Sequence, residues 1–334
     1  MNLFNKLERY YPVIAATLTF STVVVGLIVL PILTLGALMT KLWPIATMYL
    51  IWTFIIDKDT CDRGGRALDW VRNSNFYQTS FNYFPVTTKK QSDFELNSKK
   101  NYLFCCYPHG ILPIGLTCTM VSEIIGCKQL FPNHKTYLIM IKANFFIPLL
   151  RDLFLFMGSC SNSKKSMNWI LGESRGGNIA GISIGGSQEA LYCKPGEHKI
   201  ILKNKKGFVK MAIMNGSPIV PVYCFGETDV FETIQFRKFS VLETIQSWLL
   251  KTTGIAFLIF KGRRVFGIPI PLIPDRKPLN VIVGKPIDVL RNVHPTQEDI
   301  DNLHDKFITE LRNLFEIEKY KYVLNPEKTE LIIE

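Results

Sequence analysis

The chain has 334 residues, which is enough for one large domain or two ordinary ones. Hydrophobic residues make up 47% of it and its mean hydropathy is +0.14, higher than a cytosolic enzyme typically shows. The formal charge of +11 would suit a nucleic acid, an anionic membrane face or a phosphate-bearing ligand. No nucleic-acid recognition motif is present, so we expect no nucleic acid partner. The eight cysteines form no C-x-x-C pair and no zinc-like spacing, which predicts reduced, buried thiols and no metal site.

The apolar excess is concentrated near the N-terminus. No charged side chain occurs over residues 10–40, and after Lys41 the segment 42–56 is again uncharged. As one helix the first run would be about 46 Å long, well beyond a hydrocarbon core of about 30 Å, and Pro31 divides it. A cleaved signal peptide and a buried soluble helix pair are the alternatives to a membrane hairpin at this place.

We favour the membrane hairpin, with arms at about 12–30 and 32–56 inside an N-terminal segment 1–57. Lys6 and Arg9 precede it and several basic residues follow it, while only Lys41 lies between the arms, which predicts that both termini are cytosolic. Because only 15 uncharged residues follow Lys41, the hairpin is either transmembrane or re-entrant.

The rest of the chain is predicted to be a polar connector, 58–100, containing Tyr83-Phe84-Pro85, followed by a cytosolic-face domain, 101–325. Short apolar runs there alternate with helical patterns, which is typical of an α/β fold with a mostly parallel sheet flanked by helices. The predicted strands are 102–107, 137–142, 178–184, 219–224 and 279–283. The predicted helices are 145–157, 164–174, 206–215, 241–252 and 297–321, the last with a capping signal at Thr296 to Asp299. Residues 262–278, rich in proline and glycine, are predicted to be a long loop.

His109 is the first candidate for catalysis. It lies between Pro108 and Gly110 directly after the apolar run 102–107, on a stiff turn at the carboxyl end of a predicted strand, where open α/β sheets form their ligand crevice. A neutral imidazole can accept a proton from an alcohol near pH 7. A plain polar turn residue is the alternative at this stage.

Glu189 follows the second strand-to-turn transition, 178–184 and then Gly185-Gly186. A carboxylate there could meet His109 from a neighbouring strand end and orient its ring, as the acid of a triad does. The glycine amides near Gly110 or Gly186 are candidates for receiving an oxyanion. A carboxylate that only offsets a helix dipole is the alternative for Glu189.

The same stretch matches the G-x-S-x-G pattern of hydrolases at Ser183. A nucleophile elbow needs its serine at the tight turn, whereas Ser183 lies inside the predicted strand. Asp275 or Asp288 with His294 could complete the chain order, so a serine hydrolase remains a rival. We interpret Cys105 and Cys106 as packing residues rather than nucleophiles, because strand alternation points them to opposite faces.

Two basic clusters could hold an anionic ligand such as the phosphates of coenzyme A. One contains Lys206, Gly207 and Lys210, with Gly207 at the expected start of a helix whose free amides suit an anion. The other contains Arg263. A solvated or membrane-facing basic patch is the alternative for each cluster.

With these residues assembled, the chain resembles the diacylglycerol acyltransferase type 2 family, which includes monoacylglycerol and wax-alcohol acyltransferases. The matching motifs run in order through residues 10–320: Tyr83-Phe84-Pro85, Tyr107-Pro108-His109-Gly110, Ala143-Asn144-Phe145 with Pro148 and Arg151, Gly185-Gly186 with Glu189, Lys206-Gly207-Phe208-Val209-Lys210, 221–227, 283–286 and 294–300.

The resemblance implies the fold of glycerolipid acyltransferases and an endoplasmic reticulum membrane enzyme that moves a fatty acyl group from acyl-CoA to a neutral lipid alcohol. It implies that His109 is the base and Glu189 its partner, with Asn144 and Arg151 among the substrate-binding residues. Many animal members have histidine where this chain has Tyr107, while others have tyrosine, so this position is not the expected proton acceptor. Glycerol-phosphate acyltransferases place an acid five positions after the histidine; here that position is Ile114.

We therefore expect a diacylglycerol O-acyltransferase that makes triacylglycerol, with acyl-CoA as a substrate and no bound cofactor. Monoacylglycerol or a long-chain alcohol are the alternative acceptors. The expected partners are acyl-CoA, the lipid alcohol and membrane lipids, with a homo-oligomer left open. The expected location is the endoplasmic reticulum membrane or a lipid droplet surface. A non-catalytic lipid-droplet protein, which needs only the hairpin, is the rival of a different class.

Overall fold

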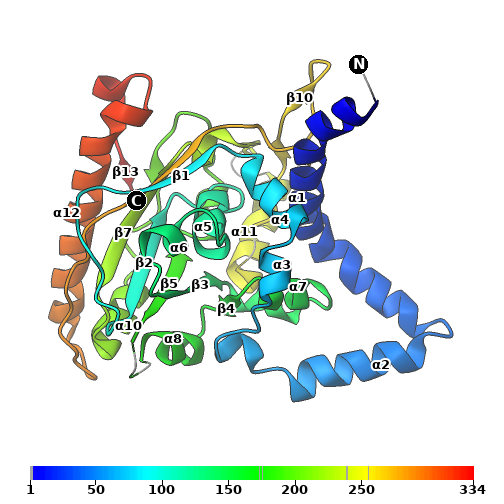
Figure 1. Cartoon of the computed structure of the whole chain (residues 1–334), viewed down its shortest axis with the longest axis horizontal. Coiled ribbons are helices and arrows are strands. Elements are labelled where there is room, and N and C mark those ends of the chain that lie inside the picture. Colours follow the sequence, from blue (N-terminus) through cyan, green and yellow to red (C-terminus); the bar gives the residue numbers. More distant parts are fainter. Residues whose placement is uncertain (1–2, 173, 175, 238–239, 255) are drawn as a thin grey trace.

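The computed structural model describes residues 3–334 except 173, 175, 238–239 and 255, and a seven-stranded sheet lies at its centre (Figure 1). The strand order is β1-β12-β7-β2-β5-β3-β4. The five strands from β7 to β4 are parallel, and β12 joins them antiparallel to β7 with β1 parallel at the edge. The sheet strands are β1 (Val86–Lys90), β2 (Tyr102–Tyr107), β3 (Lys135–Met140), β4 (Ser159–Ser161), β5 (Asn178–Ser183), β7 (Ile219–Phe225) and β12 (Leu279–Val283). The predicted α/β class with a mostly parallel sheet is confirmed.

All five predicted strands are present, and β2 and β12 have the predicted bounds. The two that were not predicted are the edge strands β1 and β4. β1 has the sequence Val-Thr-Thr-Lys-Lys and alternates between half-buried and exposed residues, and β4 has only three residues. Short or polar edge strands lack the apolar run on which the prediction depended.

Helices cover both faces of the sheet and create two hydrophobic cores. Alternation along β2 divides its side chains, with Phe104 and Cys106 in one core and Leu103, Cys105 and Tyr107 in the other. The first core is closed by α1, α4 and α5, and the second by α8, α10 and α12. These and the remaining helices are α1 (Leu3–Leu38), α2 (Trp43–Ile51), α3 (Asp69–Arg72), α4 (Asn75–Asn82), α5 (Ile114–Val121), α6 (Cys127–Leu130), α7 (Leu150–Phe156), α8 (Lys164–Leu171), α9 (Ser187–Ala190), α10 (Gly207–Asn215), α11 (Val241–Thr253) and α12 (Gln297–Tyr322).

Helices are present near all five predicted positions, but their bounds do not always match the prediction. The predicted helix 145–157 is a 3-10 turn, Lys142–Phe146, followed by α7, because Pro148 and the positive φ of Leu149 interrupt it. The end of the predicted helix 164–174 includes residue 173, which lies outside the described residues. The predicted capping box of α12 at Thr296 and Asp299 is present. The predicted loop 262–278 contains a small hairpin of β10 (Arg264–Val265) and β11 (Ile268–Pro269). The other short strands are β6 (Lys199–Ile200), β8 (Glu232–Thr233), β9 (Phe260–Lys261) and β13 (Ile332–Ile333).

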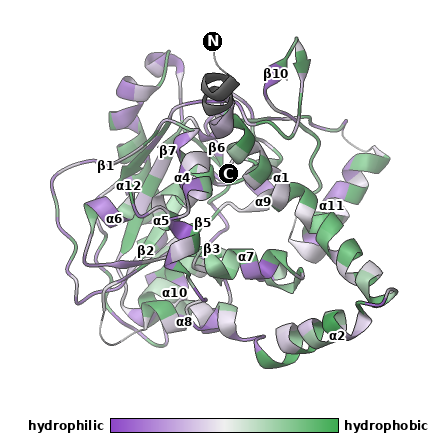
Figure 2. Cartoon of the chain, turned by 45° about the vertical axis from the view of Figure 1, so that its right-hand side comes forward, coloured by the Kyte–Doolittle hydropathy of each residue, from purple (hydrophilic) through white to green (hydrophobic). Residues whose placement is uncertain are grey.

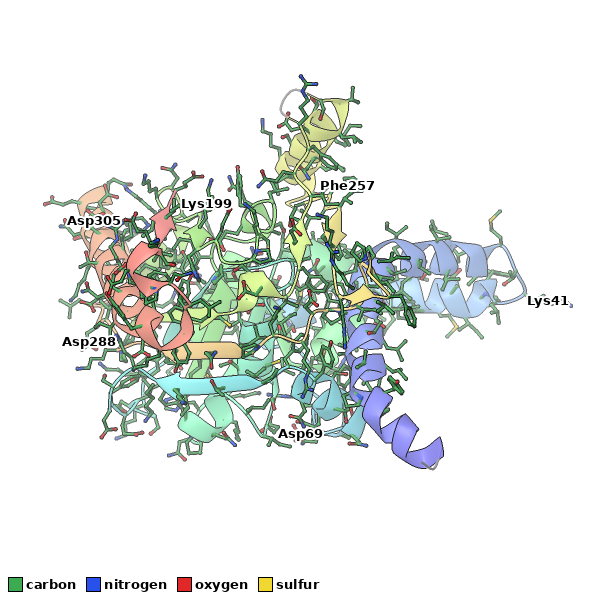
Figure 3. The ribbon with its side chains drawn as sticks, turned by 90° about the horizontal axis from the view of Figure 1, so that it is seen from above. Lys41, Asp69, Lys199, Phe257, Asp288 and Asp305 are labelled. Carbon is green, nitrogen blue, oxygen red and sulfur yellow. The ribbon has the colours of Figure 1, made fainter. Side chains whose placement is uncertain are left out.

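The N-terminal segment folds as a helical hairpin, but its turn does not lie at Pro31. α1 continues through Pro31 to Leu38, and the chain turns near Lys41 at the far tip of the hairpin (Figure 3). The division into arms 12–30 and 32–56 is therefore wrong. Proline is tolerated inside long apolar helices, and α1 contains two, Pro12 and Pro31.

Among the described residues, one helix is long and apolar enough to cross a membrane, at Tyr10–Leu38. It is not a separate anchor, because its first half is part of the main core. Ala15, Ala16 and Phe20 are buried, and the Phe20 ring stacks on Phe231 at a centroid distance of 4.4 Å. The expected boundary at residue 57 is therefore not a packing boundary, and the expected connector contributes β1 to the sheet.

Candidate active site

His109 lies just beyond the carboxyl end of β2, after the cis peptide bond between Tyr107 and Pro108. Its side chain is half-buried and lines a cavity of about 1140 Å³. Tyr107 is fully buried and packs with Phe307 in the core on the other face of the sheet. Position 107 therefore does not face the cavity, in agreement with the expectation that it is not the proton acceptor.

The imidazole of His109 is held by the main chain. Nδ1 lies 2.9 Å from the carbonyl oxygen of Gly110, whose positive φ of +62° lets the carbonyl turn back toward the ring. Because a carbonyl can only accept, Nδ1 carries the hydrogen and Nε2 keeps a free lone pair in the neutral ring. Burial lowers the pKa of His109, partly opposed by the bond to Gly110. The ring is therefore neutral at pH 7 and has the tautomer that a general base needs.

Glu189 meets His109, but not at its ring. Its Oε2 accepts a hydrogen bond of 2.7 Å from the main-chain amide of His109, and its Oε1 accepts one of 2.8 Å from the amide of Ile201. The expectation that Glu189 orients the imidazole is therefore wrong in its geometry: the Gly110 carbonyl contacts the ring, and Glu189 fixes the backbone that carries it. Burial raises the pKa of Glu189 to about 8, opposed by the two amides.

The glycines before Glu189 are required by its position. Glu189 lies in the short helix α9, and a Cβ on Gly185 would overlap the Glu189 carboxyl group. Gly186 has a positive φ of +61°. Gly185, Gly186 and His109 line the same cavity. The structure thus brings together the site residues that were predicted at the carboxyl ends of β2 and β5.

Glu227 is a second buried carboxylate that the sequence reasoning missed as a site residue. It follows β7, the other neighbour of β2, and its oxygens accept hydrogen bonds of 2.8 Å from the amides of Ile114 and Gly115 at the start of α5. Its Cγ would lie 3.1 Å from a Cβ on Gly110. Burial raises the pKa of Glu227 to about 7. Its sequence signal is the same as that of Glu189, an acid just after a buried strand and a glycine.

The two carboxylates hold the segment 109–115 at both ends. Glu189 binds its first amide and Glu227 binds its last two, so the loop that carries His109 is fixed to β5 and β7 on either side of β2. Backbone amides bound to buried carboxylates form strong, directional hydrogen bonds. This arrangement gives the His109 ring a rigid support.

The cavity beside His109 has a volume of about 1140 Å³ and a mostly apolar lining. Its wall combines the carboxyl ends of β3 and β5 with residues of α1, α4 and α11. Two polar side chains in the lining are Asn144, which was predicted, and Lys205. A cavity of this size and composition suits a ligand with long hydrocarbon chains and one reacting polar group.

The predicted basic residues are not gathered at this cavity. Lys206 forms an ion pair of 2.7 Å with Asp301 of α12, and Lys210 is exposed on α10, which Gly207 begins. Arg263 lines a separate, smaller cavity of about 330 Å³ together with Asp229 and Asp275. Lys205 is the member of the first cluster that lines the main cavity.

Arg151 was expected to bind substrate, yet its side chain is only 1% exposed. Its guanidinium binds the Asp57 carboxylate at 2.9 Å and the Asp57 carbonyl at 3.0 Å, and it lies 3.3 Å from Asp152. Arg66 binds both aspartates at 3.1 Å, and the Tyr49 hydroxyl donates to Asp152. Arg151 therefore joins the end of the hairpin to α7 and is not part of the cavity lining, so substrate binding by this residue stays a prediction.

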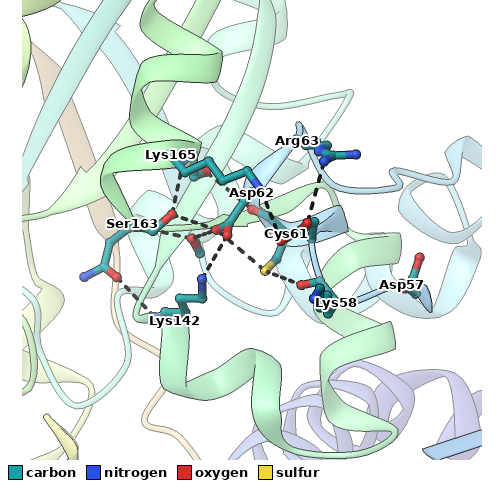
Figure 4. Close-up of polar contacts among 12 residues, drawn as sticks. Asp57, Lys58, Cys61, Asp62, Arg63, Lys142, Ser163 and Lys165 are labelled. Carbon is teal, nitrogen blue, oxygen red and sulfur yellow. Dashed lines mark hydrogen bonds and ion pairs between the residues drawn. The ribbon is translucent and has the colours of Figure 1, made fainter. Parts of the chain in front are cut away.

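Another buried carboxylate, Asp62, lies just after the hairpin. Asp62 accepts hydrogen bonds from the Ser161 and Ser163 hydroxyls and pairs with Lys142 at 2.9 Å (Figure 4). These bonds lower the pKa of Asp62 against the effect of its burial. The segment after the hairpin is thus fixed to β4 and to the start of α8.

The residues of the rival hydrolase triad are not assembled. Ser183 ends β5 and lines the cavity, and no hydrogen-bond partner for its buried hydroxyl is found in the described part of the chain. His294 is exposed on the loop before α12, and Asp288 pairs with Lys100 at the surface. Burial raises the pKa values of Cys105 and Cys106 well above normal, as expected for packing thiols. No group of three or more metal-ligating side chains is found over the described ranges.

Comparison with known proteins places these residues in a family. The model of the family described as diacylglycerol acyltransferase matches residues 36–334. The chain is 37% identical over 283 residues to human 2-acylglycerol O-acyltransferase 3, covering 84% of this chain and 82% of the relative. It is 37% identical over 277 residues to diacylglycerol O-acyltransferase 2 of Dictyostelium discoideum, covering 83% of each.

One solved structure with a similar shape is a 1-acyl-sn-glycerophosphate acyltransferase from Thermotoga maritima, with a TM-score of 0.42 and 10% identity over 92% of this chain and 96% of that one. The match of the family model to most of the chain, together with relatives above 30% identity over most of their length, is decisive. The chain belongs to the diacylglycerol acyltransferase family of enzymes.

Proposed function

We propose that the protein transfers a fatty acyl group from acyl-CoA to the free hydroxyl of diacylglycerol, with His109 as the general base. The observation that carries this proposal is a neutral imidazole, protonated at Nδ1, on the wall of a large apolar cavity. A base and a hydrocarbon-binding space at one place are what acyl transfer to a lipid alcohol requires.

In the proposed reaction, Nε2 of His109 accepts the proton of the acceptor hydroxyl as its oxygen attacks the thioester carbonyl. The carbon–sulfur bond then breaks, and the imidazolium returns the proton to the departing coenzyme A thiolate. Amides of Gly110 or Gly186 are the proposed donors to the oxyanion. Glu189 and Glu227 act as positioning residues, because they bind the loop and not the ring.

The coenzyme A portion is polar and must remain at the water-facing side of the site. Asn144 and Lys205 support this placement because they are polar residues in the lining of the cavity. We retain the prediction that Lys206, Lys210 and the amides at the start of α10 bind the phosphates of coenzyme A. We retain the same prediction for Arg263 of the second basic cluster.

The hairpin supports placement in a membrane, for which we propose the endoplasmic reticulum with both termini cytosolic. α1 has 36 residues and is about 54 Å long, whereas α2 and the π-helical turn Trp52–Ile56 after it span about 20 Å. Since the second arm is shorter than a hydrocarbon core of about 30 Å, a re-entrant hairpin is favoured over two full spans. A lipid droplet surface, covered by one lipid leaflet, would accommodate the same hairpin.

A 2-acylglycerol is the second candidate acceptor. Relatives named for 2-acylglycerol and for diacylglycerol acylation match this chain with the same identity, 37%. A cavity of about 1140 Å³ also accommodates either lipid in part, so the acceptor must be chosen by assay.

The test is a microsomal assay with labelled oleoyl-CoA, offering diacylglycerol, 2-monoacylglycerol and hexadecanol separately. We expect a labelled triacylglycerol product that His109→Ala lowers at least 100-fold, since general-base catalysis contributes about 10²- to 10⁴-fold. The matched control is His294→Ala, an exposed histidine away from the cavity, which should keep wild-type activity. Equal product from His109→Ala would remove this residue from the mechanism, and product from another acceptor alone would reassign the substrate.

A further inference from the structure

Helix α11 has an apolar face that the rest of the described chain leaves uncovered. Val241, Ile245 and Trp248 are spaced at i, i+4 and i+7, and their exposed fractions are 75%, 44% and 62%. The helix is well defined at both ends, by the Ser240 side chain that caps it and by Gly254 in the left-handed conformation. An exposed apolar stripe on such a helix indicates an interaction surface.

Other residues of α11 line the main cavity. They are Leu249, Leu250 and Thr253, while Gln246 fixes the helix to the following segment through a 2.6 Å bond to the Phe257 carbonyl. The helix α1 contributes Phe20, Val23, Val24 and Leu27 to the same cavity. α11 is therefore a wall element between the cavity and the outside.

The surroundings of α11 identify the partner as a lipid bilayer. α1, which shares the cavity with α11, is the long apolar helix of the proposed membrane hairpin, and only 22% of its most apolar window is buried. In Figure 2, α2, α11 and β10 lie on the side of the molecule away from α12, with hydrophobic residues prominent on α2 and α11. The β10–β11 hairpin presents Phe266 fully exposed, next to Arg263 and Arg264, an aromatic and basic combination that suits an anionic lipid surface.

We propose that α11 lies in the interfacial layer of the bilayer, with Val241, Ile245 and Trp248 among the acyl chains, so that the cavity opens sideways into the membrane between α1 and α11. This inference rests on the proposed function, because it needs the hairpin to be in a membrane. Tryptophan is favoured at the level of the headgroups, and an amphipathic helix buries its apolar face there. A lipid alcohol with two long chains would then reach His109 without passing through water.

The first experiment measures the depth of α11 in liposomes made from phosphatidylcholine with and without nitroxide-labelled lipids. All eight native cysteines are buried, so a cysteine introduced on the surface can be labelled with an environment-sensitive fluorophore. The test position is Ile245→Cys. The water-facing control is Asp305→Cys on α12, on the far side of the molecule in Figure 3, and the hairpin control is Leu35→Cys, 62% exposed on α1.

We expect the fluorophore at Ile245→Cys to be quenched by the nitroxide lipids at least twofold more than the one at Asp305→Cys, and to emit at shorter wavelength. Quenching at Leu35→Cys but not at Ile245→Cys would overturn this inference while leaving the membrane placement intact. No quenching at either position would overturn the membrane placement and the inference together.

The second experiment tests the sideways opening by activity. Trp248→Glu should raise the KM for long-chain diacylglycerol in membranes at least fivefold while changing transfer to dispersed dioctanoylglycerol less than twofold. The matched control is Leu324→Glu, an exposed apolar residue after α12, which should change neither value. Equal effects of Trp248→Glu on both acceptors, or no effect on either, would contradict the proposed entrance.

Discussion

Arg151 gives the sharpest test of how the hairpin is attached to the rest of the enzyme. Arg151→Met keeps the aliphatic stem but removes the charge that binds Asp57 at 2.9 Å with side-chain exposures of 1% and 10%. Arg66 would then be the cation that both Asp57 and Asp152 share, beside the hydroxyls of Thr60 and Tyr49. Removing one partner of a buried ion pair costs about 3–5 kcal/mol, and here it leaves two partly buried carboxylates with one arginine between them. At about 2–4 °C per kcal/mol, this lowers Tm by roughly 6–20 °C.

The assay is thermal unfolding of the purified protein in detergent, with the KM for oleoyl-CoA measured below the transition. Arg63→Met is the matched control, because Arg63 pairs with Asp59 at 3.6 Å with side-chain exposures of 63% and 36% (Figure 4). An exposed pair contributes about 0–1 kcal/mol, so Tm should fall by less than about 4 °C. In the double variant Arg151→Met with Asp57→Asn, part of the lost stability should return, since the uncompensated carboxylate is gone.

The alternative role of Arg151, binding of coenzyme A, predicts the opposite pattern. A variant with wild-type Tm and a KM for oleoyl-CoA raised tenfold or more would refute the structural interpretation. A lowered Tm with unchanged KM would support it, and the size of the fall would measure how strongly the hairpin is coupled to α7.

Two further predictions concern the cavity wall and its support. Glu227→Gln should lose one of the two hydrogen bonds to backbone amides and lower stability by about 1–3 kcal/mol at pH 6, the cost of leaving a buried amide without a partner. Because burial raises the pKa of Glu227 to about 7, the folded wild type binds more protons than its unfolded chain, so its stability falls as pH rises from the ordinary carboxyl range through 7. The Tm difference between the two proteins should therefore narrow from pH 6 to pH 8, and a widening difference would show that the carboxylate is stabilised by its site. Ser183→Ala should keep at least half of the transfer activity with oleoyl-CoA, and its complete loss would reinstate the hydrolase interpretation.

The elements that sequence patterns predicted are those in which local signals are strong. β2 and β12 are apolar runs bounded by turns, and α12 has a capping box and a long amphipathic period. α5 was missed because Pro113 precedes it, Gly115 lies within it, and most of its residues are buried, so it shows no helical period. Gly115 is there for packing, since a Cβ would approach the Glu227 carboxylate and Cys224.

The site was predictable to the level of which strand ends meet, but not to the level of which atoms touch. His109 and Glu189 follow neighbouring parallel strands, so their proximity follows from topology. Whether a carboxylate binds a ring nitrogen or a main-chain amide depends on the path of a few loop residues. The hydrophobic periodicity of the sequence carries no information about that path. Arg151 lies 94 residues from Asp57 in the chain, so no local pattern could reveal that its charge is already matched.

The contacts of the 109–115 loop explain how His109 is oriented although position 114 holds an isoleucine and not an acid. An enzyme with an acid five positions after its histidine can use that side chain to orient the ring. Here the main-chain amide of Ile114 binds Glu227, the amide of His109 binds Glu189, and the Gly110 carbonyl orients the ring. The orienting group is thus neutral, and the two carboxylates act on it through the backbone. The charge on the ring partner therefore does not change with pH. Under the proposed mechanism, we expect the pH dependence of catalysis to reflect chiefly the protonation of His109 and the ionisation of the two carboxyl groups that hold its loop.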